Sequence, residues 1–131
     1  MNSYLLDTHT WLWLLNSPER VHEDVKEMLA TPEATIYLSA ASVCEMSIKW
    51  SLGKLRLSEP PERVVPLSLT RERLTALPIQ YEHAVRLAAL PFHHRDPFDR
   101  LLIAQAQVES IPIVTDDPRF AAYGVEVVRA S

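Results

Sequence analysis

Short apolar runs alternate with longer segments of helical periodicity along most of the chain. Each run is four or five residues long, and most are rich in β-branched or aromatic residues, which is typical of buried strands. The runs are SYLLD at 3–7, TIYLS at 35–39, TALPI at 75–79, IPIVT at 111–115 and VEVV at 125–128. The pattern predicts a sheet of about four to five strands.

Helices are predicted between these strands, because apolar residues recur there at helical spacing. The predicted helices are THTWLWLLN at 8–16, PERVHEDVKEMLA at 18–30, AASVCEMSIKWSLG at 40–53, YEHAVRLAALP at 81–91 and DPFDRLLIAQAQVES at 96–110, with a helical turn in DDPRFAAYG at 116–124. The Pro-rich stretch 58–68 is predicted to be a surface connection. Pro60 and Pro61 can open a helix there, but Pro66 would break or kink it.

Strands that alternate with helices imply a parallel sheet with helices on both faces. The expected fold class is therefore α/β, with three layers in the order α/β/α. At 131 residues the chain is long enough to bury one ordinary core, so we expect a single domain over residues 1–131.

The composition excludes several kinds of functional site. The formal net charge is −4, so any nucleic-acid site must be local. The one cysteine, Cys44, excludes an intrachain disulfide and a thiolate metal cluster, and we expect it to be a small core residue. With only Gly53 and Gly124, the chain has no glycine-rich phosphate loop. MNSYLLD lacks the basic start of a secretory signal and WLWLL is too short to span a bilayer, so we expect a cytoplasmic protein without a membrane partner.

Several aspartates stand where helix capping alone would explain them. Asp7 and Asp117 each precede a predicted helical segment and can serve as its N-cap. Asp96 is a natural N-cap before Pro97, which places Asp99 in the first turn as the returning member of a capping box.

Glu45 also has an ordinary structural interpretation. It can form a capping box with Ser42, or an ion pair with Lys49 four residues later. Taken singly, each of these acids is explained by local helix chemistry.

Taken together, the acids predict a metal site. Asp7 and Asp117 follow strands, and the carboxyl ends of parallel strands lie along the edge of the sheet where ligands bind. Glu45 lies near the start of the helix that follows the second strand, and Asp99 lies in the first turn of a helix that can pack against the same edge. Clustered carboxylates repel one another, and a hard divalent cation such as Mg²⁺ relieves that repulsion. Its waters are the reagents for hydrolysis of phosphodiesters.

Four motifs in order resemble the PIN domain, and more narrowly the VapC-type ribonuclease toxins of bacterial type II toxin–antitoxin pairs. They are SYLLDTHTWLW, SAASVCEMSIKWSLGKL, HHRDPFDRLLIAQA and IPIVTDDPRFAAYGVEVV. The resemblance covers nearly the whole chain and is weakest across 55–80. It implies a Rossmann-like α/β/α fold and an endoribonuclease that depends on Mg²⁺ or Mn²⁺. It also implies a homodimer and inhibition by a small VapB-like antitoxin.

The resemblance assigns roles to individual residues. The four family acids fall on Asp7, Glu45, Asp99 and Asp117. Asp96 and Asp116 are neighbouring acids that offer a second candidate at the third and fourth positions.

The expected mechanism divides these acids into two groups. Asp7, Asp99 and Asp117 are expected to hold Mg²⁺ directly or through its waters. Glu45 would ligate a second ion or orient the attacking water as general base. The Thr115 hydroxyl is expected to bond a metal water or a carboxylate, or to make an ordinary strand-end contact.

Basic side chains near the motifs are candidate contacts for RNA phosphates. They are Lys49, Lys54, Arg56, Arg95 and Arg100. His93 and His94 are expected to contact RNA or to lie in a loop. On the apolar helix 8–16 we expect at least one of Trp11 and Trp13 in the core, and hypothesise an antitoxin or dimer contact for the other.

Three other functions stay open at this point. One is a binding module of the same fold that captures RNA or antitoxin without useful turnover. Another is a structure-specific DNA nuclease, which the short chain disfavours. The third is a phosphoacceptor receiver domain, which is disfavoured because LLDTH lacks an acidic pair and no lysine follows Lys54.

Overall fold

Five parallel strands form the central sheet of the computed structural model, which describes residues 2–131. The strands are β1 (Ser3–Leu6), β2 (Thr35–Ser39), β3 (Thr75–Leu77), β4 (Ile113–Val114) and β5 (Val127–Val128). Their order in space is β3-β2-β1-β4-β5, and each neighbouring pair is parallel. The predicted α/β class with a parallel sheet is confirmed, with five strands.

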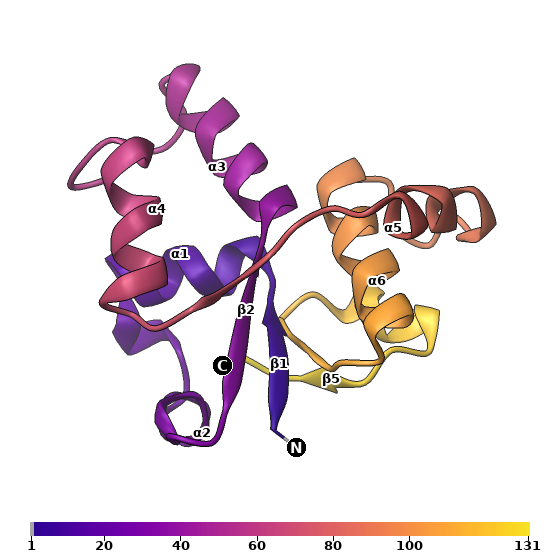
Figure 1. The fold of residues 1–131 in the computed structure, drawn as a ribbon, viewed down its shortest axis with the longest axis horizontal. Helices are drawn as coiled ribbons and strands as arrows, with labels where there is room; N and C mark the ends of the chain where they lie inside the picture. The colour runs from indigo at the N-terminus through magenta and orange to yellow at the C-terminus, as the bar shows by residue number, and fades with distance from the viewer. Residues whose placement is uncertain (1) are drawn as a thin grey trace.

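Helices flank both faces of the sheet (Figure 1). They are α1 (Thr8–Asn16), α2 (Glu23–Ala30), α3 (Ala40–Ser51), α4 (Pro61–Thr70), α5 (Tyr81–Arg86) and α6 (Pro97–Glu109), with the 3₁₀ segments η1 (Pro18–Arg20), η2 (Leu87–Ala89) and η3 (Pro118–Tyr123). One face packs against α1, α2 and α4, and the other against α6 and η3, with α5 packed on α6. Helix α3 contributes to both hydrophobic clusters.

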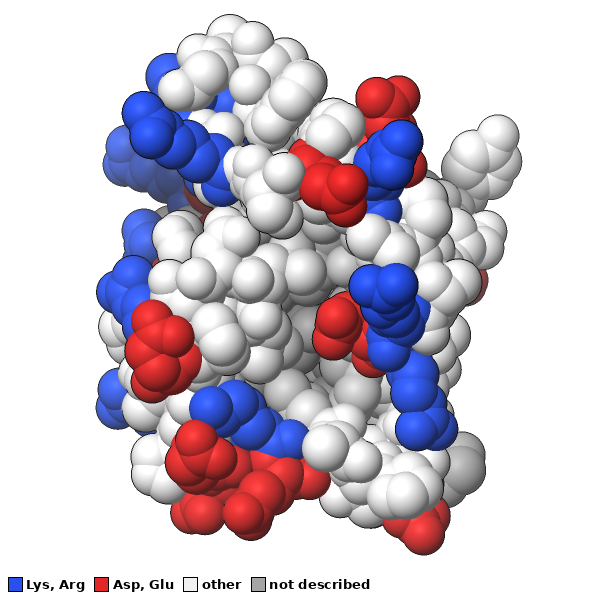
Figure 2. All heavy atoms as spheres, turned by 90° about the vertical axis from the view of Figure 1, so that its left-hand side faces the viewer, with Lys and Arg blue, Asp and Glu red and all other residues white. Residues whose placement is uncertain are grey.

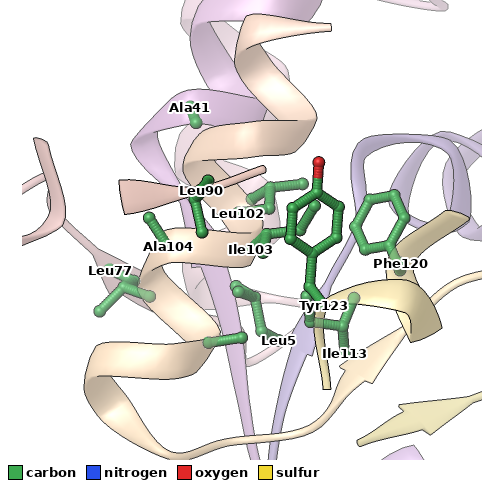
Figure 3. Close-up of a cluster of buried hydrophobic side chains, with 11 residues drawn as sticks. Leu5, Ala41, Leu77, Leu90, Leu102, Ile103, Ala104, Ile113, Phe120 and Tyr123 are labelled. Carbon is green, nitrogen blue, oxygen red and sulfur yellow. The ribbon is translucent and has the colours of Figure 1, made fainter. Parts of the chain in front are cut away.

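Successive residues of each strand point to opposite faces and so enter different hydrophobic clusters. Leu5 packs with α6 and η3, whereas Leu6 packs with α1, α2 and α4. Ile113 and Val114 divide in the same way. Figure 3 shows the first of these clusters, in which Leu5 and Ile113 lie close to Tyr123 of η3. Because both faces are buried, the strands read as continuous apolar runs.

The carboxyl ends of β1, β2 and β4 lie at one edge of the sheet, and polar residues occupy that edge. In Figure 1, β1 and β2 run side by side toward the start of α3. Asp7 follows β1 directly, Ser39 ends β2 and caps α3, and Thr115 follows β4. This is the edge at which open parallel sheets bind ligands.

The surface connection predicted over 58–68 is mostly helical, because α4 covers Pro61–Thr70. The helix that Pro60 and Pro61 could open is confirmed, whereas the expected break at Pro66 is wrong. Pro61 stands at the first helical position, where its missing N–H costs nothing. Pro66 lies inside the helix, yet the helix continues because Val64 and Ser68 are buried on the face turned to the core. The Ser68 hydroxyl accepts the indole N–H of buried Trp11 at 3.2 Å. Packing outweighs the local preference of proline here.

The predicted helix over 18–30 is divided into η1 and α2. Val21 interrupts it with extended backbone and buries its side chain in the core. His22 then begins α2, where its ring nitrogen accepts the Asp24 N–H at 3.1 Å. The segment is helical on both sides of Val21, but this buried valine separates the short 3₁₀ segment η1 from α2.

Two further expectations need correction. Cys44 is exposed on α3 and is not a core residue. Ser42 does not cap α3, because Ser39 accepts the Ala41 N–H at 3.0 Å and Ser42 instead accepts the Thr8 hydroxyl at 2.9 Å. The helix begins three residues earlier than a Ser42 box requires.

The core expectation for the tryptophans is confirmed by Trp11, which is fully buried. Trp13 is half-buried, and the Arg20 guanidinium lies 4.6 Å from the centre of its ring. Over residues 2–131, no helix combines the length and apolar character needed to cross a bilayer.

Charges of both signs border a broad uncharged area on the side of the molecule that carries α2 and α4. Figure 2 shows this face, with Lys and Arg interspersed among Asp and Glu. It therefore offers no uniformly basic field to a polyanion, as the net charge of −4 indicates.

Candidate metal centre

Asp7 and Thr115 lie beyond the ends of neighbouring strands and hydrogen-bond to each other. Asp7 caps α1 by accepting the Thr10 N–H at 2.8 Å. Its other carboxylate oxygen accepts the Thr115 hydroxyl at 2.6 Å. The same hydroxyl accepts the Asp117 N–H at 3.0 Å. Thr115 thus makes the carboxylate contact that was one of its expected roles, and links the first acid to the backbone of the fourth.

Glu45 enters the site from α3 and is only 5% exposed. The Lys49 ammonium donates to Glu45 Oε2 at 2.7 Å, which is the i,i+4 pair among the two alternatives for Glu45. Within the described residues, Glu45 Oε1 is buried and has no hydrogen-bond partner. A buried oxygen with unused lone pairs is costly unless something binds it.

Asp96 and Asp99 have different roles at the start of α6. Asp96 is the N-cap, and its Oδ1 accepts the N–H groups of Phe98 at 2.8 Å and Asp99 at 3.1 Å. Asp99 does not return the expected bond to the cap, because the Asp96 N–H donates to His94 Nδ1 at 3.2 Å. The Asp99 carboxylate instead lies 3.0 Å from His94 Nε2.

Asp117 caps η3 and accepts hydrogen bonds on both carboxylate oxygens. Oδ1 accepts the Arg119 N–H at 2.9 Å and its Nε–H at 3.0 Å. Oδ2 lies 2.8 Å from Arg119 Nη2 and 2.9 Å from His94 Nε2. The fourth acid is therefore fixed by a bidentate arginine and by the histidine that also meets Asp99.

These side chains converge in one place. Glu45, Asp96 and Asp99 offer oxygens that lie within 4.8 Å of one another. His94, Asp99 and Asp117 do the same, so Asp99 belongs to both groups. Glu45, Asp99 and Asp117 are thus joined through Asp99. Asp7 belongs to neither group, but its charge acts on Asp99, and Thr115 links its carboxylate to the backbone of Asp117.

The acids repel one another strongly at Asp99. Burial raises the pKa of the Asp99 carboxyl, and the charges of Asp96, Glu45, Asp7 and Asp117 raise it further, to about 8. A carboxyl group with this pKa holds its proton at neutral pH unless a cation replaces it.

The pKa values of Asp7 and Asp117 are shifted in opposite directions. Burial raises the pKa of Asp7, although hydrogen bonds from Thr10 and Thr115 oppose the shift. Burial also acts to raise the pKa of Asp117, but hydrogen bonds from Arg119 and His94 outweigh it and lower the value to about 2. Asp117 therefore stays ionised at neutral pH, whereas Asp7 and Asp99 are destabilised as anions.

The donor set fits a hard divalent cation. It consists of carboxylate oxygens, which Mg²⁺ and Mn²⁺ prefer, and includes the buried, unpartnered Oε1 of Glu45. A cation would relieve the repulsion that raises the pKa of Asp99. Asp7, Glu45, Asp99 and Asp117 are the residues that would hold it.

Asp116 points away from this centre. Its carboxylate accepts hydrogen bonds from the backbone N–H and the hydroxyl of Ser131 near the end of the chain. Of the two neighbouring acids, the structure brings Asp96 into the cluster and leaves Asp116 outside it.

The expectation that Arg100 contacts RNA is wrong. Its side chain is 7% exposed, and its guanidinium donates to backbone oxygens inside the protein. The acceptors are the carbonyls of Leu87, Leu90, Pro91 and His94, at 2.8–3.4 Å. Lys49 is tied to Glu45 at the margin of the site. The remaining candidates, Lys54, Arg56 and Arg95, are exposed.

His94 and Arg119 are site residues that sequence reasoning missed. His94 is 2% exposed and bridges two acids, although its position in a loop suggested solvent or RNA. The available signal was the histidine two residues before the N-cap Asp96, where a ring nitrogen can accept the cap's N–H. Arg119 stands two residues after Asp117 and gave no comparable signal.

A second group of possible ligands, formed by Glu82, His83 and Glu109, is occupied by internal bonds. His83 Nδ1 accepts the Gln80 N–H at 2.9 Å, so its proton is on Nε2. That nitrogen lies 2.7 Å from Glu109 Oε2 and donates to it. The ring therefore has no free lone pair for a metal.

The sequence matches the family description "PIN domain" over residues 4–126. The chain belongs to the PIN-domain family. PIN domains bind metal through acidic residues and are typically nucleases. In this PIN domain, the acidic cluster described above is the group of residues that could hold a metal ion. No curated protein matches the sequence.

Solved structures of similar fold include VapBC2, FitAcB and a toxin–antitoxin complex. One is a chain of VapBC2 from Rickettsia felis bound to a promoter DNA fragment, with TM-score 0.72 and 17% identity over 96% of this chain and 97% of that chain. Another is FitAcB from Neisseria gonorrhoeae, with TM-score 0.67 and 22% identity over 97% of both chains. A toxin–antitoxin complex from Klebsiella pneumoniae gives TM-score 0.66 and 18% identity over 98% of both chains. The fold of this PIN domain is therefore similar to that of chains in these structures.

Proposed function

We propose that this chain is the toxin of a type II toxin–antitoxin pair and acts as a metal-dependent endoribonuclease. The observation that carries the proposal is the gathering of Glu45, Asp96 and Asp117 around Asp99. Burial, together with the charges of these acids and of Asp7, raises the pKa of the Asp99 carboxyl to about 8. Helix capping explains the position of each aspartate singly, but capping gives no reason for them to face one another. A site for a divalent cation does.

A bound Mg²⁺ or Mn²⁺ would supply Lewis acidity toward a phosphate oxygen and would lower the pKa of a coordinated water. Asp7 and Asp99 are the buried donors, each destabilised as an anion in the absence of a counter-charge. Asp117 has both oxygens in hydrogen bonds, so its remaining lone pairs suit a contact through water.

Glu45 has a free oxygen at the site and serves as general base or as ligand of a second ion. Lys49 neutralises Oε2 and leaves Oε1 without a partner. The oxygen that is free is thus the one able to accept a proton from water or to bind an ion. The Lys49 ammonium, being part-exposed, can also meet a substrate phosphate.

RNA would reach the acids from the surface that carries the exposed basic side chains. Lys54 and Arg56 follow α3, which bears Glu45, and Arg95 precedes α6, which bears Asp99. Such contacts position a backbone without reading its sequence. The likeness of the fold to chains solved in VapBC and toxin–antitoxin complexes supports a VapB-like antitoxin as a partner of this chain. The homodimer stays a prediction from the family resemblance.

The test is cleavage of labelled single-stranded and structured RNA by the purified protein, with Mg²⁺, with Mn²⁺ and with a chelator. Asp7→Asn and Asp99→Asn are expected to abolish cleavage while the far-UV circular dichroism is unchanged, because each removes a ligand without removing volume. DNA of the same sequence shows whether the sugar is recognised. Metal-independent cleavage, or full activity of both variants, would contradict the proposal.

A further inference from the structure

We infer that His94 is a positioning residue that holds the third and fourth acids of the site in register, acting as a hydrogen-bond donor and never as a metal ligand. The inference rests on the proposed metal-dependent function and adds a residue to it. It starts from a buried imidazole that lies between two carboxylates from different elements, Asp99 of α6 and Asp117 before η3.

The tautomer of His94 follows from its hydrogen bonds. Nδ1 accepts the backbone N–H of Asp96 at 3.2 Å, so Nδ1 carries no proton. The proton is therefore on Nε2, which lies 3.0 Å from Asp99 Oδ2 and 2.9 Å from Asp117 Oδ2. This N–H donates to Asp117, and the Asp99 carboxylate lies against the same nitrogen, which has no lone pair left for a cation.

The rest of the protein fixes the ring in this orientation. The His94 N–H donates to the Tyr123 hydroxyl at 2.8 Å, and the His94 carbonyl accepts from Arg100 Nη1 at 3.1 Å. The ring meets Phe120 edge-on at 5.7 Å between centroids. Figure 3 shows Phe120 and Tyr123 side by side, with the Tyr123 hydroxyl directed away from the strands.

This arrangement gives buried Arg100 a function as well. Its guanidinium closes the loop 87–94 onto α6 by bonding to the carbonyls of that loop. The loop then presents His94 to both acids. The consequence is that Asp99 and Asp117 are held at a fixed separation before any cation binds, which lowers the cost of organising the site.

Asn and Gln substitutions at His94 distinguish the role of Nδ1 from that of Nε2. The amide of Asn can replace the Nδ1 acceptor but does not reach the acids, whereas the longer Gln can place an N–H near the Nε2 position. We expect His94→Asn to weaken Mn²⁺ binding, measured by isothermal titration calorimetry, by roughly 10- to 100-fold. His94→Gln is expected to restore binding to within about threefold of the natural protein.

His93→Asn is the matched control, because His93 is exposed and adjacent and contacts no acid of the site. The RNA-cleavage assay supplies a second measurement. In it, His94→Asn is expected to shift the Mn²⁺ concentration for half-maximal cleavage upward by a similar factor, whereas His93→Asn leaves it unchanged. Circular dichroism and thermal melts without metal establish that each variant is folded.

Equal Mn²⁺ affinity of His94→Asn and the natural protein would overturn the inference, and so would an equal loss in the folded Asn and Gln variants. If His94→Asn does not fold, Tyr123→Phe takes its place. It removes the hydroxyl that anchors the His94 backbone and is expected to weaken Mn²⁺ binding about threefold or more; unchanged affinity would overturn the inference. Absence of Mn²⁺ binding by the natural protein would instead overturn the proposed function.

Discussion

The carboxyl group of Asp99 lies among four other acids, and its ionised form lowers the stability of the metal-free protein. Its pKa is raised to about 8 from an ordinary value of 3.8, first by burial and then by the neighbouring charges. A group whose pKa is raised by folding stabilises the fold below its unfolded value. That contribution is lost as the pH rises through the folded value. The metal-free protein should therefore lose stability between about pH 4 and pH 8 through this group.

Asp99→Asn is predicted to raise the melting temperature of the metal-free protein at pH 8 by several degrees, because the amide cannot ionise. At pH 4 the carboxyl is largely protonated in the folded protein, so the difference should be much smaller. Thermal melts in chelator at several pH values measure this, and added Mn²⁺ should reverse the order. A variant less stable than the natural protein at pH 8 in chelator would refute the prediction.

Adjacent Asp116 and Asp117 provide a matched pair at the fourth acid position. Asp117→Asn is predicted to slow Mn²⁺-dependent cleavage by at least about 10-fold, because it removes a charge held at the centre by His94 and Arg119. Asp116→Asn should leave the rate within about twofold, because Asp116 bonds to Ser131 instead. Initial cleavage rates of the two variants test the assignment of Asp117 as the fourth acid. A slower rate in Asp116→Asn than in Asp117→Asn would contradict that assignment.

The convergence of the acids could be predicted from their positions after strands and at helix starts, since a parallel sheet brings those positions to one edge. The roles of His94 and Arg100 could not. Sequence gives the charge of Arg100 but not its burial, which depends on how the loop 87–94 folds back over α6. His94 likewise meets Asp117 only through a contact across 23 residues of chain.

At the scale of elements, periodicity predicted the strands and most helices but missed α4. The propensity of Pro66 favoured a break, whereas the burial of Val64 and Ser68 against the core favoured a helix. Tertiary packing decided the outcome, and nothing in the local sequence measures it. The strands β4 and β5 are also shorter than their apolar runs, because only two residues of each form the ladder.

Pro66→Ala is therefore predicted to stabilise the protein. The alanine restores an N–H that can bond to the Glu62 carbonyl, and interior proline costs about 3 kcal/mol relative to alanine. Greater freedom of the unfolded chain offsets about 1 kcal/mol of this. We expect the free energy of unfolding in urea to rise by about 2 kcal/mol. Pro61→Ala is the control, since proline is suited to the first helical position. A gain in the control equal to that of Pro66→Ala would contradict the explanation.

For the molecule as a whole, the sheet order places the site. β1 is central, with β2 on one side and β4 on the other, so Asp7 stands between the segments that carry Glu45 and Asp117. The alternation of strands and helices predicted this parallel architecture. It could not predict which helix face would be exposed, which is why Cys44 was wrongly expected in the core.

If these separated acids form one site for a divalent cation, anomalous scattering from crystals of the protein grown with Mn²⁺ will locate the ion. We expect a strong peak in contact with carboxylate oxygens of Asp7 and Asp99, with Glu45 and Asp117 around it, and loss of that peak in Asp99→Asn. Crystals saturated with Mn²⁺ that show no peak there, or a peak only elsewhere, would contradict this expectation.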